Sequence, residues 1–205
     1  PMSCSIGAFH AAFHTKMGVY HHEMGVKAGG KMAILAGAGP MGMGMIDYAL
    51  HGDRQPAQLV VTDINEDRLA RARELFTEED AAKQGVKLTF VNTKDMADPA
   101  ADLKEISDGG FDDVYVYAPI SSVVELASDI LGRDGCLSFF AGPTDNKFSA
   151  KLNFYDVHYN STHVIGTTGG NTADMIESLE LTAAGRIHPA VMVTHVGGLN
   201  CAGET

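Results

Sequence analysis

Three glycines and one aspartate carry the strongest chemical signal in the sequence. Gly37, Gly39 and Gly42 stand in the spacing G-x-G-x-x-G. In a dinucleotide site the first glycine allows a tight turn, the second lets the backbone approach a pyrophosphate, and the third lets a helix pack closely on a strand. Asp63 follows Gly42 by 21 residues, where an acid accepts hydrogen bonds from an adenosine ribose. Together these residues predict nucleotide binding.

Asp63 also favours one cofactor over another. A carboxylate there repels the 2′-phosphate of NADP and pairs with the free 2′-hydroxyl of NAD. Arg68, one helical turn further on, leaves two interpretations open. It stacks on adenine or meets a phosphate, or it is a solvated residue that pairs with Glu66 or Asp67. The sequence predicts NAD, with NADP less favoured.

The residues around this motif alternate between short apolar runs and helical patterns. Six runs are predicted as strands: Met32–Ala36, Leu59–Thr62, Lys87–Val91, Asp113–Tyr117, Cys136–Ala141 and His163–Gly166. Strands that are apolar throughout, with helices between them, are typical of a parallel sheet covered on both faces. We therefore predict an α/β fold with a doubly wound six-stranded parallel sheet, the Rossmann fold.

The predicted helices between these strands position the loops. They cover Met41–Leu50, Glu66 to about Ala81, Ser121 or Ser122 to Leu131, and Asn171 or Thr172 to Gly185. Apolar residues at helical spacing are expected to face the sheet, which in the last helix are Met175, Ile176 and Leu179. Before the first strand we predict a helix over Ser5–His14 and a glycine-rich linker over residues 17–30.

The loops that follow the last three strands are rich in small residues. In open α/β sheets, ligands lie outside the carboxyl ends of the strands, where the strand order reverses. Small residues there suit the close approach of a flat nicotinamide ring, although ordinary turn chemistry explains any single one of them equally well. The candidate contacts are Ala118, Pro119, Ala141, Gly142, Thr167 and Thr168.

Composition limits the function classes. The 205 residues carry 15 Lys and Arg against 26 Asp and Glu, a formal net charge of −11, so no basic surface is expected to bind nucleic acid or an anionic membrane. Three cysteines are scattered without a C-x-x-C pair, which indicates a reducing cytoplasm. No apolar run reaches the roughly 18 residues of a membrane span.

No familiar catalytic motif is present. None of the six tyrosines has a lysine four residues on, as short-chain reductases do, and the motifs G-x-S-x-G and G-K-[ST] are absent. His10, His14, His21 and His22 lie close in sequence, but among acids and cysteines only Glu23 adjoins them. Surface histidines are the better interpretation. We predict no catalytic residue and no metal ligand in this chain.

Several segments together resemble the medium-chain, zinc-dependent alcohol and polyol dehydrogenases. They are Gly37–Gly42, the strand that ends in Asp63, Asp67–Leu69, and Pro189–His195. The likeness is to sorbitol and threonine dehydrogenases and, most of all, to the sorbose-1-phosphate reductase branch. The resemblance implies NAD contacts at Gly37, Gly39, Pro40, Met41, Gly42, Asp63, Ile64 and Arg68, and a nicotinamide wall in the three small-residue loops.

The resemblance also implies that this chain is the cofactor part of a longer enzyme. In that family a catalytic zinc is held mainly by an N-terminal barrel-like domain, to which nothing here corresponds. Residues 1–30 would be the connecting helix and linker, 31–187 the NAD-binding domain, and 188–205 a strand leading back, from Thr194 and His195 onward, to the missing domain. A small alcohol, ketone or sugar phosphate would be the substrate, and the chain alone would be inactive.

Two further expectations concern partners and rival functions. We predict a homo-oligomer formed through the sheet edge, with Phe148–Leu152 as an edge strand beside the sixth strand. Two other functions use the same fold: a non-catalytic nucleotide-sensing module, and a methyltransferase that binds adenosylmethionine.

Overall fold

Six parallel strands form the central sheet of the structure, a computed structural model that describes residues 1–16 and 18–203. Their order across the sheet is β5 (Lys87–Asn92), β4 (Gln58–Asp63), β3 (Lys31–Leu35), β6 (Phe111–Val116), β7 (Leu131–Phe139) and β8 (His163–Gly166). Strand order reverses at β3, which has β4 on one side and β6 on the other. The predicted doubly wound parallel sheet is confirmed.

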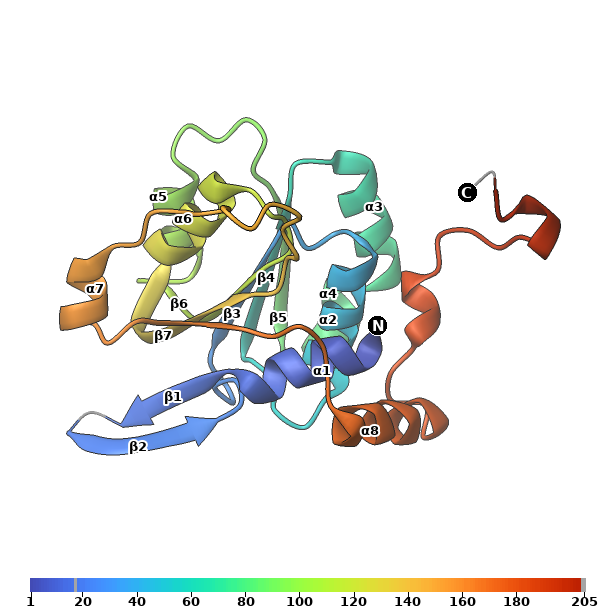
Figure 1. Cartoon of the computed structure of the whole chain (residues 1–205), viewed down its shortest axis with the longest axis horizontal. Helices are drawn as coiled ribbons and strands as arrows, with labels where there is room; N and C mark the ends of the chain where they lie inside the picture. The colour runs from blue at the N-terminus through green and yellow to red at the C-terminus, as the bar shows by residue number, and fades with distance from the viewer. Residues whose placement is uncertain (17, 204–205) are drawn as a thin grey trace.

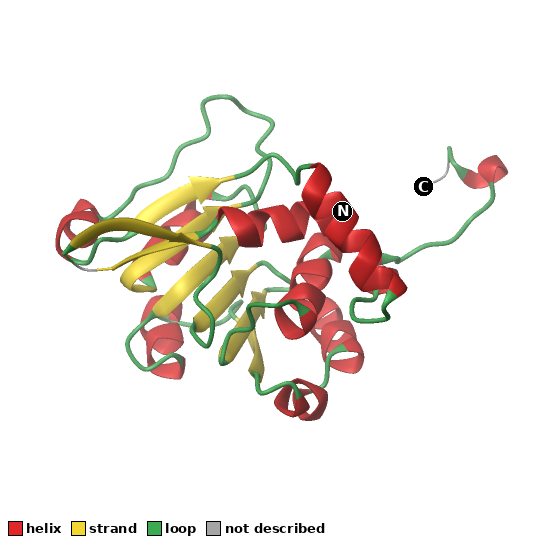
Figure 2. Cartoon of the chain, turned by 90° about the horizontal axis from the view of Figure 1, so that it is seen from below, coloured by secondary structure: helices red, strands yellow, loops and turns green. Residues whose placement is uncertain are grey.

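Helices cover both faces of this sheet (Figure 1, Figure 2). One face packs against α1 (Met2–Ala11), α2 (Pro40–His51), α3 (Glu66–Leu75), α4 (Glu78–Lys83) and α8 (Thr172–Ala183). The other packs against α5 (Pro99–Ile106) and α6 (Ser121–Asp129). Successive residues of β3 point to opposite faces, so Met32 and Ile34 enter the first core while Ala33 and Leu35 enter the second. Both faces are therefore buried, which explains why the strands are apolar throughout.

The first thirty residues contain more structure than the sequence predicted. The helix ends at Ala11, because Ala12 takes an extended conformation, and His14 lies in a strand. In place of the linker over residues 17–30, β1 (Phe13–Lys16) and β2 (Val19–Met24) form an antiparallel hairpin; Met17 lies outside the described residues. The backbone N–H and hydroxyl of Thr15 donate to Asp134. This anchor lies 119 residues away, so local patterns could not reveal it.

The helix predicted from Glu66 to about Ala81 is two helices. Phe76 takes an extended conformation after α3 and buries its ring in the core. Thr77 then caps α4, because its hydroxyl accepts a hydrogen bond from the Asp80 N–H. Burial of the Phe76 ring therefore ends one helix, and a new cap starts the next.

The boundary between α6 and β7 also differs from the prediction. The N-cap of α6 is Ile120, not Ser121 or Ser122, and the Ser121 hydroxyl donates to a carbonyl in a distant loop instead. The helix stops before Leu131, which is the first residue of β7. A shift in register along β6 lets β7 begin there rather than at Cys136.

In α8 the predicted cap is confirmed, but the predicted buried side is wrong. Asn171 and Asp174 form a reciprocal capping box. Met175, Ile176 and Leu179 are 55%, 51% and 69% exposed. Their spacing is helical, yet α8 packs against α1 rather than lying flat on the sheet, so its buried side is narrow.

Two predicted strands are absent from the described residues. Phe148–Leu152 forms no strand and hydrogen-bonds to α6 instead, so β8 is one of the two edge strands of the sheet. A short helix, α7 (Phe154–Tyr159), precedes β8. After α8 the chain forms two 3-10 turns, η1 (Pro189–Met192) and η2 (Leu199–Cys201). The strand expected from Thr194 and His195 onward is not formed in the described residues. The end of this segment lies away from the sheet (Figure 1). In the described part of the chain, no helix is long and apolar enough to cross a membrane.

Candidate nucleotide-binding site

The turn between β3 and α2 uses its three glycines in three different ways. A Cβ on Gly42 would lie 2.0 Å from the Gly37 carbonyl oxygen, and a Cβ on Gly37 would lie 2.5 Å from the Ile34 side chain. A Cβ on Gly39 would meet nothing within 4 Å. The outer two glycines therefore allow close packing, and the middle one leaves bare backbone facing open space.

The start of α2 suits an anionic group. Gly39 is the N-cap and provides no side-chain cap, Pro40 is the first helical residue, and no acidic side chain lies in the first turn. Free backbone N–H groups and the positive end of the helix dipole attract a phosphate at such a terminus. Pro40 and Met41 thus lie where a pyrophosphate would meet the helix.

Asp63 lies at the carboxyl end of β4, beside this turn. It is 6% exposed. Its Oδ1 accepts hydrogen bonds from the N–H groups of Ile64 and Asn65 at 2.9 and 3.0 Å. Its Oδ2 accepts a single, longer bond of 3.2 Å from the Ala38 N–H. The carboxylate therefore holds the glycine turn against β4 and keeps a lone pair of Oδ2 for a ribose hydroxyl.

Ile64 and Arg68 complete this side of the site. The Ile64 side chain is 64% exposed, and Arg68 is exposed on the first turn of α3. Glu66, one of the two acids weighed as an Arg68 partner, pairs with Arg73 at 2.6 Å instead. Within the described residues no carboxylate pairs with Arg68, so its guanidinium is available to a ligand.

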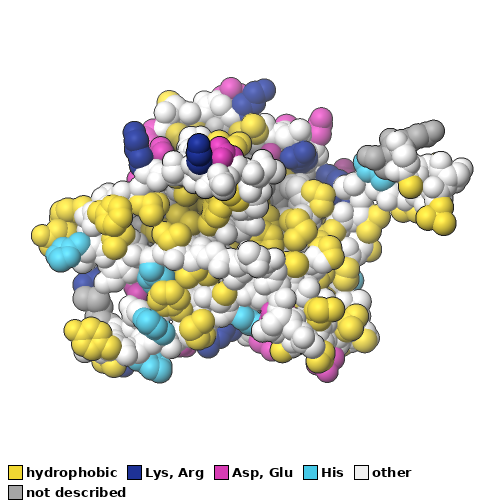
Figure 3. Space-filling view, viewed as in Figure 1, with side chains coloured by type: hydrophobic (Ala, Val, Ile, Leu, Met, Phe, Trp, Pro, Cys, Tyr) yellow, Lys and Arg dark blue, Asp and Glu magenta, His cyan; other side chains and the backbone are white. Residues whose placement is uncertain are grey.

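A hollow of about 600 Å³ opens at the same end of the sheet, within the range of typical small-molecule sites. Five of the predicted contacts line it: Met41, Ala141, Gly142, Thr167 and Thr168. Ala118 and Pro119 do not, although Tyr117 beside them donates its N–H to the carbonyl of Leu35 at the end of β3. Apolar side chains gather across this face of the molecule (Figure 3).

The sequence did not reveal the other residues of this hollow. They include Cys4 from α1 and Phe139 and Phe140 from the end of β7. Cys4 is far from the motif in sequence and reaches the hollow only because α1 packs across α2. Phe139 and Phe140 could have been predicted from the sequence, because they lie at the carboxyl end of a strand, directly before one of the small-residue loops.

The hollow can hold and orient a flat ring, but it offers little acid–base chemistry. Its lining contains no Asp, Glu, His, Lys or Tyr. The nearby Tyr117 phenol stays protonated, because burial raises its pKa. Thr167 contributes a hydroxyl that is buried and has no partner among the described residues. An unpartnered buried hydroxyl is costly unless a ligand binds it.

The early histidines do not form a metal pair. His10 lies on α1 and bonds to Asp174 at 2.8 Å, whereas His14 lies on β1 between Asp113 and Asp134. The hairpin, where histidines gather in Figure 3, exposes His21 and His22. His21 and His22 are exposed, as the sequence favoured, whereas His14 is mostly buried and is not the surface histidine that the sequence predicted.

Several known proteins with similar sequences are named as dehydrogenases or reductases. A model of the zinc-binding dehydrogenase family matches residues 40–184. The chain is 58% identical over 206 residues to mannitol-1-phosphate 5-dehydrogenase of Aliivibrio fischeri, covering 100% of this chain and 49% of that protein. It is 48% identical over 207 residues to L-sorbose 1-phosphate reductase of Klebsiella pneumoniae, with 100% and 49% covered. The chain spans about half the length of the curated relatives it matches.

The fold is also found among solved structures. An alcohol dehydrogenase from Escherichia coli CFT073, solved with NADH, superimposes with a TM-score of 0.73 at 12% identity. The match covers 100% of this chain and 52% of that one. At this identity the likeness shows a shared fold.

Proposed function

The chain belongs to the zinc-binding dehydrogenase family, and we propose that it binds NAD(H) and orients the nicotinamide for hydride transfer. The resemblance inferred from the sequence is confirmed by the family match and by the sugar-phosphate relatives. One observation carries the proposal. At the end of the sheet where strand order reverses, a glycine turn with open backbone at Gly39 adjoins a buried acid, Asp63, and an apolar hollow.

NAD is the cofactor we favour over NADP. Asp63 is buried beside the glycine turn, and a carboxylate there disfavours a ribose 2′-phosphate. Gly37, Gly39, Pro40, Met41 and Gly42 would hold the pyrophosphate. Ile64 and Arg68 would contact the adenosine, and the loops after β6, β7 and β8 would form the nicotinamide wall. The bound dinucleotide supplies the hydride chemistry, and the chain supplies position and electrostatics.

The substrate class we propose is a polyol, a sugar phosphate or a secondary alcohol with its ketone. The two sequence relatives are named for phosphorylated sugars or polyols. Cys4 is the one residue of a metal-binding type that lines the hollow, which is too few ligands for a catalytic zinc. We therefore place the zinc ligands and the proton relay in the other half of a longer enzyme, and we expect this chain alone to turn nothing over.

Two smaller proposals accompany this function. β8 has a neighbouring strand, β7, on one side only, and we infer that a second copy of the chain covers its other side. The three cysteines form no disulfide with one another, which suits the reducing cytoplasm.

Calorimetry with NADH, NADPH and adenosylmethionine in parallel tests the function. We expect weak binding, because the chain forms one side of the site, with NADH tightest. Asp63→Ser should weaken NADH at least about tenfold, since a hydrogen bond to a charged group contributes roughly 1.5–3 kcal/mol. Asp67→Asn, on the exposed side of α3, is the matched control and should leave binding unchanged.

Three outcomes would overturn parts of the proposal. Tightest binding of adenosylmethionine would favour a methyltransferase. Tighter binding of NADPH than of NADH would show that Asp63 does not disfavour a ribose 2′-phosphate. A dehydrogenase rate from this polypeptide alone would show that the reacting groups lie within it.

A further inference from the structure

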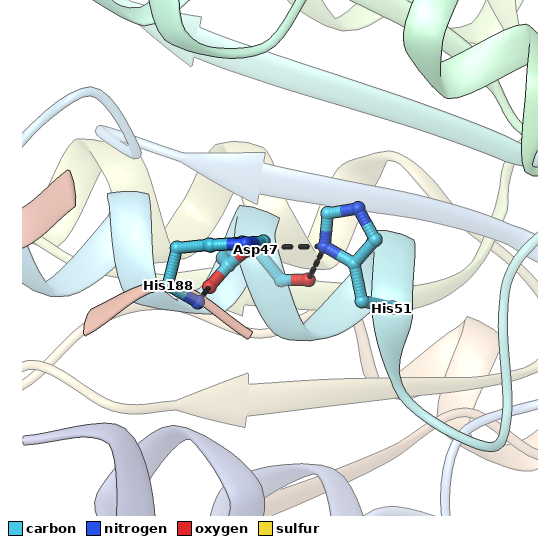
Figure 4. Close-up of side chains that lie close together, drawn as sticks. All are labelled: Asp47, His51 and His188. Atoms are coloured by element: carbon cyan, nitrogen blue, oxygen red, sulfur yellow. Dashed lines mark hydrogen bonds and ion pairs between the residues drawn. The ribbon is translucent and has the colours of Figure 1, made fainter. Parts of the chain in front are cut away.

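A second cluster of chemically active side chains lies at the other end of α2. Asp47 and His51 stand one helical turn apart near the end of that helix, and His188 precedes η1. Figure 4 shows the three side chains turned toward one another. None of them lines the hollow at the carboxyl end of the sheet.

Distances within the cluster match those between ligands of one metal ion. His51 Nδ1 lies 2.9 Å and His188 Nδ1 3.6 Å from the same oxygen, Asp47 Oδ1, and all three candidate ligand atoms lie within 4.8 Å of one another. Ligand atoms about 2.0–2.2 Å from a tetrahedral zinc lie roughly 3.3–3.6 Å apart, and the two distances to Asp47 Oδ1 are close to this spacing.

The Asp47 carboxylate is held in place on both oxygens. Its Oδ2 accepts a hydrogen bond from the backbone N–H of His188, and its Oδ1 faces His51. The side chain is 0% exposed, while those of His51 and His188 are 26% and 58% exposed. A ligand fixed by such a bond is preorganised for a cation.

Among the described residues, the ion-pair partners of the buried Asp47 carboxylate are imidazoles. A buried carboxylate without a counter-charge is strongly unfavourable. In this part of the chain, no Lys or Arg pairs with Asp47. The guanidinium of Arg186 bonds to Asp53 and to the His51 carbonyl instead. A neutral imidazole leaves this charge unbalanced, and a divalent cation would balance it.

The cluster is also open to solvent on one side. His51, Arg186 and His188 line a surface hollow together with Gln55 and Gln84. Water from this hollow can complete a coordination shell that the protein fills with three ligands. We propose that Asp47, His51 and His188 form a binding site for a divalent transition-metal ion, with Zn²⁺ the best match to two imidazoles and one carboxylate.

Such a site would tie η1 to α2. His188 lies in the segment that leads from α8 to η2, and the other two ligands lie on a helix of the core. A bound metal would therefore stabilise the path of the chain at this point without contacting the proposed dinucleotide site.

Metal binding to the metal-free chain tests the proposal. Titration with Co²⁺ should produce the visible absorption of a nitrogen- and oxygen-ligated ion, and Zn²⁺ should displace it at one equivalent. Zn²⁺ should also raise the thermal midpoint of unfolding, because a ligand that binds only the folded state stabilises it. His188→Gln, at a half-exposed position, should lower the affinity at least tenfold and remove the thermal shift.

Two controls keep the test decisive. His21→Gln, on the exposed hairpin strand, should bind like the parent chain, and far-UV circular dichroism should show that both variants are folded. His51→Gln should repeat the loss seen with His188→Gln. Unchanged Zn²⁺ affinity in both ligand variants, or a site lost only when the thiols are alkylated, would overturn the proposal. So would the absence of Zn²⁺ binding at micromolar concentration.

Discussion

The two ends of the sheet differ in whether their buried polar groups have hydrogen-bond partners within the chain. At the amino end, the buried carboxylate of Asp113 is paired within the chain, because it accepts hydrogen bonds from His14 and from the Lys27 N–H. At the carboxyl end, the hollow is lined by small and apolar residues and contains the unpartnered hydroxyl of Thr167. The fold itself supplies the partners of Asp113 at the amino end, whereas the carboxyl end leaves backbone and hydroxyl groups for a ligand.

Gly42→Ala should produce the largest effect at the carboxyl end. The new Cβ would lie 2.0 Å from the Gly37 carbonyl oxygen, and a backbone atom cannot rotate away as a side chain can. We expect the free energy of unfolding to fall by about 3 kcal/mol, the upper range for overpacking, with loss of NADH binding. Urea unfolding and calorimetry measure the two effects.

Gly39→Ala is the matched control for this change. Its Cβ would meet nothing, and its φ of −82° suits alanine. Stability should change by less than about 0.5 kcal/mol, while NADH binding weakens because the methyl group points toward the proposed pyrophosphate. Equal destabilisation by both substitutions would contradict the different roles assigned to the two glycines.

The carboxyl end was the more predictable of the two from sequence. The glycine spacing, the acid after β4 and the small-residue loops are local signals, and a rule of sheet topology says where they meet. The amino end depends on contacts between distant segments, such as Thr15 with Asp134, which no local pattern encodes. For the same reason the sequence did not predict the β1–β2 hairpin, and it predicted the wrong buried side of α8. The Asn171 cap of α8 is a local feature and was predicted correctly.

At the amino end, His14 should make stability depend on pH. Its Nε2 lies 3.1 Å from Asp113 Oδ1 and its Nδ1 3.1 Å from the Asp134 carbonyl oxygen. Both neighbours are acceptors, so both ring nitrogens must donate, which requires the protonated ring. Burial alone would lower the pKa of His14, but the hydrogen bonds and charges of Asp113 and Asp134 outweigh it and raise the pKa above its ordinary value of 6.5.

The stabilising effect of His14 should therefore be greatest in acid. It is fully present below about pH 6.5 and is lost as the pH rises through the raised pKa of the folded state. Near pH 5.5, His14→Gln should cost about 2 kcal/mol in the free energy of unfolding, and the difference should shrink at alkaline pH. His158→Gln, exposed on α7, should show no such trend, and NADH binding should be unaffected in both. If the difference in the free energy of unfolding between the parent and His14→Gln grew with pH, His14 would not be a stabilising imidazolium.

A pair of Thr→Val substitutions compares the two ends directly, with the smallest expected effects. Thr15 donates its hydroxyl to Asp134 at 2.6 Å, so Thr15→Val should lower the free energy of unfolding by about 1 kcal/mol and leave NADH affinity unchanged. The buried hydroxyl of Thr167 has no hydrogen-bond partner in the described part of the chain, so Thr167→Val should change stability by less than about 0.5 kcal/mol. The same substitution should weaken NADH binding severalfold, because the ligand would lose its hydrogen bond with that hydroxyl. If Thr167→Val instead destabilised the chain as much as Thr15→Val and spared the cofactor, the carboxyl end would be as self-contained as the amino end.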